Sequence, residues 1–120
     1  MRASDAFGKY GENVAVDALR HAGFELVDRN WRCREGEVDV LARDGSTLVV
    51  CEVKTRAGVA YGSPLEAVTP AKVKRLRRLG LRWLDEHQPS WVRNVRVDVV
   101  GVLCPPGGVP TIEHVRGVEL

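Results

Sequence analysis

Charged residues interrupt two short apolar segments in the first half of the chain, at spacings that could serve metal chemistry. Glu37 and Asp39 lie in the first segment, and Glu52 and Lys54 lie in the second. Residues two apart on a strand share one face of a sheet. Carboxylate oxygens are the ligands that Mg²⁺ and Mn²⁺ prefer, and a nearby lysine can offset charge on a bound phosphate. The spacing therefore favours a magnesium or manganese site on a β-hairpin.

The dipeptide Asp44-Gly45 joins these segments and predicts a two-residue hairpin loop. With that loop, Asp39 and Glu52 become diagonal neighbours on one face, about 7–8 Å apart, and Glu37 lies opposite Glu52. A three-residue loop would turn Glu52 to the other face unless a bulge restored the register. The turn and the candidate site are thus a single joint prediction.

The two faces of this hairpin differ in composition. One face carries Val38, Val40, Ala42, Val49, Cys51 and Val53. We expect this apolar face to be buried and the charged face to be exposed or to line a cleft. A solvated sheet face is the alternative interpretation. Like charges opposite each other destabilise a sheet, and a divalent cation would relieve that repulsion.

A second cluster of charge lies between Thr69 and Trp83, where six cations occur without an acid. Thr69 followed by Pro70 predicts a capped helix that runs to about residue 87. Five of its cations are candidate nucleic-acid contacts: Lys72, Lys74, Arg75, Arg78 and Arg82. Such contacts give affinity for phosphates without sequence selectivity. A merely solvated helix face remains the alternative.

The elements that must position these residues follow from hydrophobic periodicity and turn signals. We expect helices over about 5–22 and 70–87, strands over 24–33, 37–43, 47–55 and 91–103, and a short strand over 111–115. A loop rich in small residues, 56–64, is predicted to be mobile, and 104–120 forms a C-terminal tail. The order αβββαβ, with a terminal β, predicts an α/β fold in which helices flank a mixed central sheet.

Length and composition indicate an ordinary globular chain. The sequence has 120 residues, of which 44% are hydrophobic and 28% charged, and its net charge is +2. We expect one domain over 1–120. No segment has the roughly 20 apolar residues of a membrane span or the pattern of a signal peptide, so we expect a cytoplasmic protein.

An acidic residue on one strand followed by Glu-x-Lys on the next resembles the PD-(D/E)XK nuclease superfamily. The segment GKYGENVAVDALRHAGFELVDRNWRCREGEVDVLARDGSTLVVCEVKTR more closely resembles the YraN-like family of small bacterial proteins. That family is similar to archaeal Holliday junction resolvases. The resemblance covers about 8–102, includes the strand RVDVV, and implies a restriction-endonuclease-like fold.

The resemblance also implies roles for individual residues. Asp39 corresponds to the metal-binding aspartate, and Glu52 and Lys54 to the Glu-x-Lys pair, although Val38 stands where the superfamily name has proline. Glu12 matches the helix glutamate that resolvases add to the catalytic and metal site. Two auxiliary candidates were identified outside this set: Glu37, characteristic of the family, and Arg96, which shares a strand face with Asp98.

The implied activity is Mg²⁺- or Mn²⁺-dependent endonucleolytic hydrolysis of DNA. A resolvase cuts two strands symmetrically, so the analogy also predicts a homodimer. Branched DNA, flaps, single strands and RNA all stay open as substrates. Two other functions remain: a nuclease fold that binds DNA or RNA without cutting it, and an interaction protein whose acidic cleft receives a basic partner.

Overall fold

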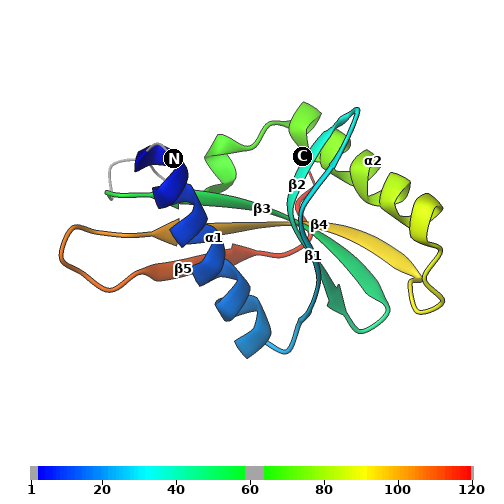
Figure 1. The fold of residues 1–120 in the computed structure, drawn as a ribbon, viewed down its shortest axis with the longest axis horizontal. Coiled ribbons are helices and arrows are strands. Elements are labelled where there is room, and N and C mark those ends of the chain that lie inside the picture. The colour runs from blue at the N-terminus through cyan, green and yellow to red at the C-terminus, as the bar shows by residue number, and fades with distance from the viewer. Residues whose placement is uncertain (1–2, 59–63, 120) are drawn as a thin grey trace.

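Helices and strands follow one another in the predicted order (Figure 1). The structure, a computed structural model, describes residues 3–58 and 64–119. The elements are α1 (Ala3–His21), β1 (Glu25–Cys33), β2 (Gly36–Asp44), β3 (Thr47–Arg56), the 3₁₀ turn η2 (Pro64–Ala67), α2 (Pro70–His87), β4 (Asn94–Leu103) and β5 (Thr111–Val115). Neither α1 nor α2 is long and apolar enough to cross a membrane.

All strands belong to one five-stranded sheet with the order β1-β2-β3-β4-β5. Strands β3 and β4 are parallel, and the other neighbouring pairs are antiparallel. The parallel pair needs a crossover connection, which contains α2. This arrangement confirms the predicted α/β fold with a mixed sheet flanked by helices.

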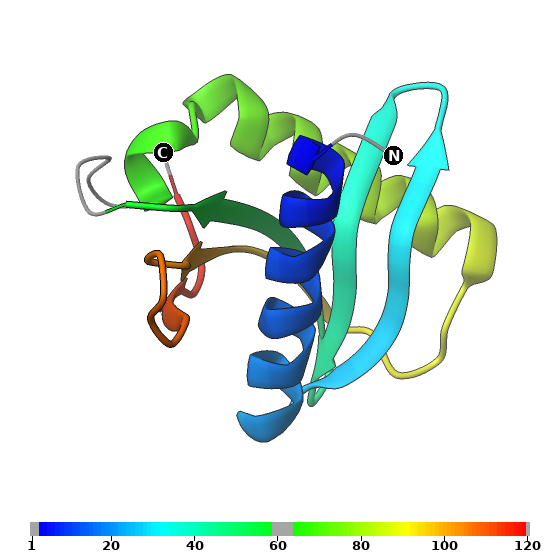
Figure 2. The same ribbon diagram turned by 60° about the vertical axis from the view of Figure 1, so that its left-hand side comes forward.

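The helices cover opposite faces of the sheet, so the central strands are buried on both sides (Figure 2). Val40, Ala42, Val49 and Cys51 pack in one cluster with residues of α1. The alternate residues Leu41, Leu48 and Val50 pack in the other cluster with residues of α2. The prediction that one hairpin face would be solvated or line a cleft was therefore wrong for most of its length. At the charged end, Val38 is fully buried in the cluster with α2, so the prediction that it shares a face with Val40 was also wrong.

Helix α2 begins and ends as its sequence predicts. The Thr69 side chain accepts a hydrogen bond of 3.1 Å from the backbone N–H of Lys72, which caps the first turn. Val73, Leu76, Leu79, Gly80 and Trp83 form the buried stripe. These residues recur at three- and four-residue intervals, so one side of the helix packs on the sheet and the other carries the cations.

The β2–β3 hairpin has a two-residue loop, but the loop is Gly45-Ser46 rather than the predicted Asp44-Gly45. Asp44 pairs with Thr47, and Gly45 has a φ of 62°. A loop with glycine in the left-handed region at its first position avoids placing the side chain of Asp44 there. The register moves by two residues, which is a full side-chain period, so the residues of the ladder keep the faces predicted for them.

Other boundaries differ little from prediction. Strand β4 begins at Asn94 instead of residue 91, because the N–H groups of Arg93 and Asn94 both donate to the Ser46 carbonyl before the ladder with β3 starts. The short terminal strand over 111–115 is confirmed. Of the predicted mobile loop 56–64, residues 59–63 lie outside the described residues.

Candidate functional site

Strands β2 and β3 separate at the end that carries the charged residues. Their ladder runs from Asp44 opposite Thr47 to Val40 opposite Cys51. Beyond that pair, β2 continues alongside β1, while β3 continues alongside β4. Figure 2 shows the β1–β2 hairpin and the end of β3 diverging, with α1 beside the opening. We call this opening, bounded by residues 36–39 and 52–56, the fork.

Asp39 lies at the base of the fork. Asp39 lies one residue beyond the last β2–β3 pair, and its carboxylate is close enough to Glu52 for a hydrogen bond, whereas the prediction made the two diagonal neighbours within the ladder. The Asp39 Oδ2 accepts a hydrogen bond of 2.9 Å from the Val53 N–H. Burial, a hydrogen bond with Glu52 and the charges of Glu52 and Glu12 raise the pKa of Asp39 to about 7.

Glu52 is buried, with 7% of its surface exposed, and Lys72 Nζ lies 3.0 Å from its Oε2. That oxygen nevertheless has no hydrogen bond of acceptable geometry, so the ion pair satisfies it poorly. Burial alone would raise the pKa of Glu52, but a hydrogen bond with Asp39, the contact with Lys72 and the charges of Lys72 and Lys54 hold it below its ordinary value. Just below pH 7 Asp39 is therefore mainly protonated, while Glu52 is ionised.

A cleft of about 630 Å³ opens between α1 and the fork. Its lining residues are Asp5, Phe7, Gly8, Lys9, Glu12, Asn30, Arg32, Glu37, Asp39, Val53 and Thr55. Three of the predicted site residues thus meet on one cleft from two elements, Glu12 from α1 and Glu37 and Asp39 from β2. Glu52 and Lys54 are not part of the lining, and Glu52 lies behind Asp39, against α2.

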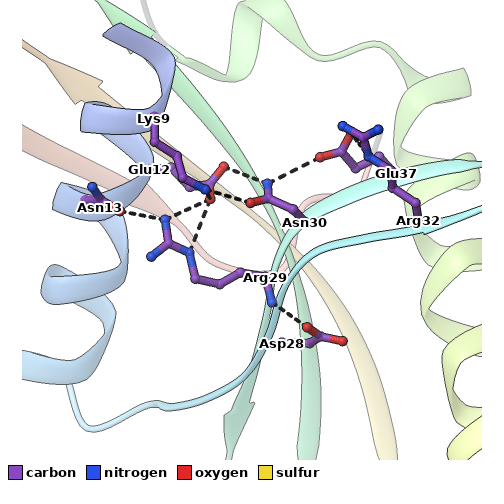
Figure 3. A network of polar contacts seen from close by, with 8 residues as sticks. All are labelled: Lys9, Glu12, Asn13, Asp28, Arg29, Asn30, Arg32 and Glu37. Atoms are coloured by element: carbon purple, nitrogen blue, oxygen red, sulfur yellow. Dashed lines mark hydrogen bonds and ion pairs between the residues drawn. The ribbon is translucent and has the colours of Figure 1, made fainter. Parts of the chain in front are cut away.

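Glu12 projects from α1 toward β1, where donors surround its carboxylate (Figure 3). Arg29 donates to Oε1 from Nη2 at 2.9 Å and from Nε at 3.2 Å. Asn30 Nδ2 donates to Oε2 at 3.0 Å, and Lys9 Nζ lies 3.5 Å from Oε1. Glu12 is only 8% exposed, so both of its oxygens are already engaged by the protein.

Asn30 links the two sides of this network. Its Nδ2 also lies 3.3 Å from Glu37 Oε1, and its Oδ1 accepts a bond of 2.9 Å from Lys9. Arg32 lies 3.1 Å from the other oxygen of Glu37. Asn30 has a φ of 51°, in the left-handed region that few non-glycine residues adopt. Backbone strain of this kind is concentrated at functional sites.

A close approach between α1 and β3 sets the position of Glu12. A Cβ placed on the neighbouring Gly11 would lie 2.0 Å from the Thr55 Oγ1. Only glycine therefore allows the helix to pack this tightly against the end of β3. The contact brings α1 to the fork and so places Glu12 on the same cleft as Asp39.

The five predicted nucleic-acid contacts on α2 fall into two groups. Lys72 turns inward to Glu52, and Arg82 pairs with Glu35 at 2.8 Å and with Glu86 at 3.4 Å. The other three side chains are exposed and form no ion pair with any described residue: Lys74, Arg75 and Arg78. Of the five, only these three are unpaired with any described residue; Arg77, outside the predicted set, is also exposed and donates to the Val95 carbonyl.

Arg96 lies elsewhere. Its guanidinium binds Asp98 at 2.8 and 3.2 Å and Asp44 at 3.0 Å, which places it at the hairpin-turn end of the sheet. Arg96 is not among the residues that line the cleft. Arg96 therefore links β4 to the end of β2 through its ion pairs with Asp98 and Asp44, and it does not contact the candidate site.

Within residues 3–58 and 64–119, no three carboxylate, histidine or cysteine side chains are grouped closely enough to form a ready-made metal site. The donor set still fits a hard cation. Asp39 and Glu52 lie within hydrogen-bonding reach of each other, Asp39 has a pKa raised to about 7, and Glu52 Oε2 is buried with no well-formed hydrogen bond. Oxygen donors of this type suit Mg²⁺ or Mn²⁺.

Several residues of the site escaped the sequence analysis. The sequence pattern indicates only that Arg29 and Asn30 are polar positions in a predicted strand and that Gly11 lies in a predicted helix. A polar run inside a strand and a glycine beside a candidate helix acid are the signals that could have identified them. Their partners lie 17 to 44 positions away in sequence, so no local pattern pairs them.

Comparisons with known proteins identify the family. The model of the "Uncharacterised protein family UPF0102" matches residues 11–102. A UPF0102 protein of Kineococcus radiotolerans is 58% identical over 99% of this chain and 98% of its own length. One from Beutenbergia cavernae is 57% identical, covering 98% and 99% of the two chains. One from Streptomyces coelicolor is 54% identical, covering 98% and 92%. The matched region contains every residue of the fork and of the Glu12 network except Lys9, and on this basis the chain belongs to the UPF0102 family.

Proposed function

We propose that the protein is a Mg²⁺- or Mn²⁺-dependent endonuclease that hydrolyses phosphodiester bonds in DNA. The observation that carries the proposal is the carboxylate pair in the fork. Asp39 and Glu52 lie within hydrogen-bonding reach of each other beside an open cleft, and burial together with the neighbouring carboxylates raises the pKa of Asp39 to about 7. Buried acids with perturbed pKa values in a cleft are typical of functional sites.

In this proposal Asp39 and Glu52 hold the cation, together with the Val53 carbonyl. Bound there, Mg²⁺ would polarise a phosphate and lower the pKa of a water molecule. Lys54 lies near enough to Glu52 to lower its pKa electrostatically. We assign to Lys54 the positioning of the attacking water and the offset of charge that grows on the phosphate.

Glu12 takes a different role from the one that the family resemblance implies. Because Arg29 and Asn30 occupy its oxygens, Glu12 ties α1 to β1 and shapes the cleft. Its charge still reaches Asp39 and contributes to the raised pKa. Direct ligation of a cation by Glu12 would require Arg29 to move.

The exposed cations of α2 would hold the DNA backbone. Lys74, Arg75 and Arg78 are unpaired with any described residue and can each neutralise a phosphate. By analogy with resolvases, two copies of the chain would act on the two strands of a branched substrate in the bacterial cytoplasm.

Cleavage of labelled DNA with Mg²⁺ or Mn²⁺ tests the activity. We expect Asp39→Ala and Lys54→Ala each to reduce the rate by about 10³-fold, since each removes a group that acts on the reacting phosphate. Arg82→Ala is the matched control, because Arg82 is engaged by Glu35 and Glu86. Undiminished cleavage by either site variant would refute the assignment.

Calorimetry tests the cation site separately. Titration of Mn²⁺ into the wild-type protein should release heat, and Asp39→Ala should abolish it. The proton on Asp39 must leave when the cation binds, so the observed heat should depend on the ionisation enthalpy of the buffer. Equal heats for both proteins would place the cation elsewhere.

A second function, DNA binding without cleavage, is favoured by one set of contacts. Lys72 already neutralises Glu52, and Glu12 is fully engaged, so the site is electrostatically compensated without a cation. A non-catalytic protein would bind DNA equally in EDTA and in Mn²⁺ and would cut nothing. The catalytic proposal instead requires that Mn²⁺ strengthen binding.

The salt dependence of DNA binding tests the basic helix under either function. Arg75→Ser with Arg78→Ser should reduce the slope of log Kd against log salt by about 2, one for each lost phosphate contact. Arg82→Ser should change it by less. An unchanged slope in the double variant would remove α2 from the interface.

A further inference from the structure

An exposed aromatic ring lies at the cleft beside the carboxylates. Phe7 is 36% exposed and is the one aromatic residue among the described residues that line the cleft. The rest of the lining is dominated by charged and amide side chains. A large apolar face left accessible on a polar wall is a feature that a planar ligand can use.

The surroundings of the ring leave room for such a ligand. Gly8 follows Phe7 and also lines the cleft, and a Cβ placed on Gly8 would meet no atom within 4 Å. The cleft volume of about 630 Å³ lies within the range of roughly 300–1,000 Å³ that is typical of sites for small molecules. The tight packing of Gly11 on Thr55 fixes this part of α1 against the sheet.

The charges of the cleft select the kind of ligand. Lys9 and Arg32 lie on the lining with half or more of their side chains exposed, at 50% and 77%. The carboxylates of Glu37 and Asp39 share the same lining, so an anion would enter only together with a divalent cation. A suitable ligand therefore has a planar apolar face for the ring of Phe7 and a phosphate that the exposed cations and a divalent cation can neutralise. A nucleotide has that chemistry.

We propose that Phe7 is a stacking platform for an unpaired base, so that the cleft takes single-stranded DNA. Bases in a duplex are already stacked on their neighbours, whereas an unpaired base has a face free to stack on an aromatic side chain. The platform lies on the same cleft as Asp39, so a stacked base would bring its phosphate toward the fork. This inference rests on the proposed function and names the substrate form for it.

Binding of a fluorescent oligothymidylate of about 12 nucleotides tests the inference. Ca²⁺ replaces Mg²⁺ in the assay to supply the charge without cleavage, and a blunt duplex of equal length is measured in parallel. Phe7→Ala should weaken binding of the single strand roughly 5- to 100-fold and change duplex binding less than about twofold. Phe7→Trp should retain single-strand binding, and Phe7→Leu should lose it, because only the aromatic face stacks.

Tyr10 supplies the matched control. It is an aromatic residue on the same helix, is 47% exposed and does not line the cleft. Tyr10→Ala should leave single-strand binding within about twofold of wild type. Thermal melting of each variant confirms that the fold is retained, which the exposure of both side chains leads us to expect.

The outcomes separate the two proposals. If the wild type binds DNA and Phe7→Ala binds the single strand equally well, the stacking inference is wrong and the proposed function stands. Equal losses for single strand and duplex would also overturn the inference, because they indicate a general rather than a stacking effect. If the wild type binds neither the single strand nor the duplex, whether Ca²⁺ or EDTA is present, the proposed function fails and the inference fails with it.

Discussion

Asp98 on β4 and the Asp39–Glu52 pair of β2 and β3 are two carboxylate sites in this sheet, and they differ in the hydrogen-bond donors that surround them. Asp98 on β4 is 0% exposed and pairs in register with Cys51, the residue before Glu52. Four donor atoms surround its carboxylate, two from Arg96, one from His114 at 2.8 Å and the Gly117 N–H at 3.0 Å. Burial would raise the pKa of Asp98, but these donors together hold it below its ordinary value.

Asp39 has the opposite environment. It accepts a hydrogen bond from the Val53 N–H, and the charged group that acts on it most strongly is another carboxylate, Glu52. Burial and that neighbour raise its pKa to about 7. A fully satisfied acid stabilises a fold, whereas an acid left short of donors stores instability that a cation or proton can relieve. The comparison therefore separates a structural carboxylate from a functional one within a single sheet.

Amide substitution should give the largest contrast between the two sites. Asp98→Asn should lower the free energy of unfolding by about 3–5 kcal/mol, because the amide N–H₂ faces donors and Arg96 loses its buried partner. Asp39→Asn should leave stability equal or raise it near pH 7.5, since the amide can still accept from Val53 and can donate to Glu52. Urea unfolding of both variants measures the difference.

A large loss of stability in Asp39→Asn would contradict this contrast, because it would show that the ionised pair in the fork stabilises the fold. Asp44→Asn serves as a control for the amide change. Asp44 is 37% exposed in its side chain and contacts Arg96 with one oxygen, so its substitution should cost less than that of Asp98.

The pH dependence of stability should differ next. The folded pKa of Asp39, about 7, lies above its ordinary value of 3.8, so between these values the folded state holds a proton that the unfolded chain has released. The free energy of unfolding should therefore fall as pH rises from about 4 through 7, by roughly 1–3 kcal/mol relative to Asp39→Asn. Asp98, whose pKa is lowered, contributes stability that is present above pH 3.8 and is lost at lower pH.

Chemical denaturation of wild type and Asp39→Asn at pH 5 and pH 8, without divalent cations, measures this effect. The two proteins should differ more at pH 8 than at pH 5. Parallel stability curves across that range would mean that Asp39 ionises normally in the folded state.

Removal of the cationic partner should also destabilise the Asp98 site more than the Asp39–Glu52 pair. Arg96→Met should cost about 3 kcal/mol because it leaves Asp98 buried without its main partner. Lys72→Met should cost about 1 kcal/mol or less, since Lys72 is 31% exposed in its side chain and its contact with Glu52 lacks good hydrogen-bond geometry. Thermal melting compares the two variants, and equal losses would remove the distinction between the two sites.

Much of the fold could be predicted because its signals are local. Thr69 and Pro70 mark the first turn of α2, and short apolar segments on either side of Asp44-Gly45 mark β2 and β3. The predicted hairpin is present, although its turn lies one residue later than predicted. The loop moved from Asp44-Gly45 to Gly45-Ser46, but the register moved by a full side-chain period, so the residues of the ladder kept the faces predicted for them.

The site could be predicted only in part. Spacing selected Asp39, Glu52 and Lys54, and the structure brings the first two within hydrogen-bonding reach of each other. Spacing also selected Lys72 as an outward phosphate contact, but packing of α2 turns it inward to Glu52. The direction of a long side chain depends on which charged group a distant segment brings near it, and no local pattern contains that information.

The sequence by itself determined the helices, the strands, which residues of the hairpin ladder share a face, and the types of residue available for chemistry. These properties depend on neighbours a few positions apart. The tertiary structure alone decided that β2 and β3 separate at Asp39 and that Arg29 and Asn30 donate hydrogen bonds to the Glu12 carboxylate. It also decided that the carboxylate of Asp98 is surrounded by hydrogen-bond donors while that of Asp39 is not. Such outcomes depend on burial and on donors from distant segments, because the energy of a charge is set by what surrounds it in space.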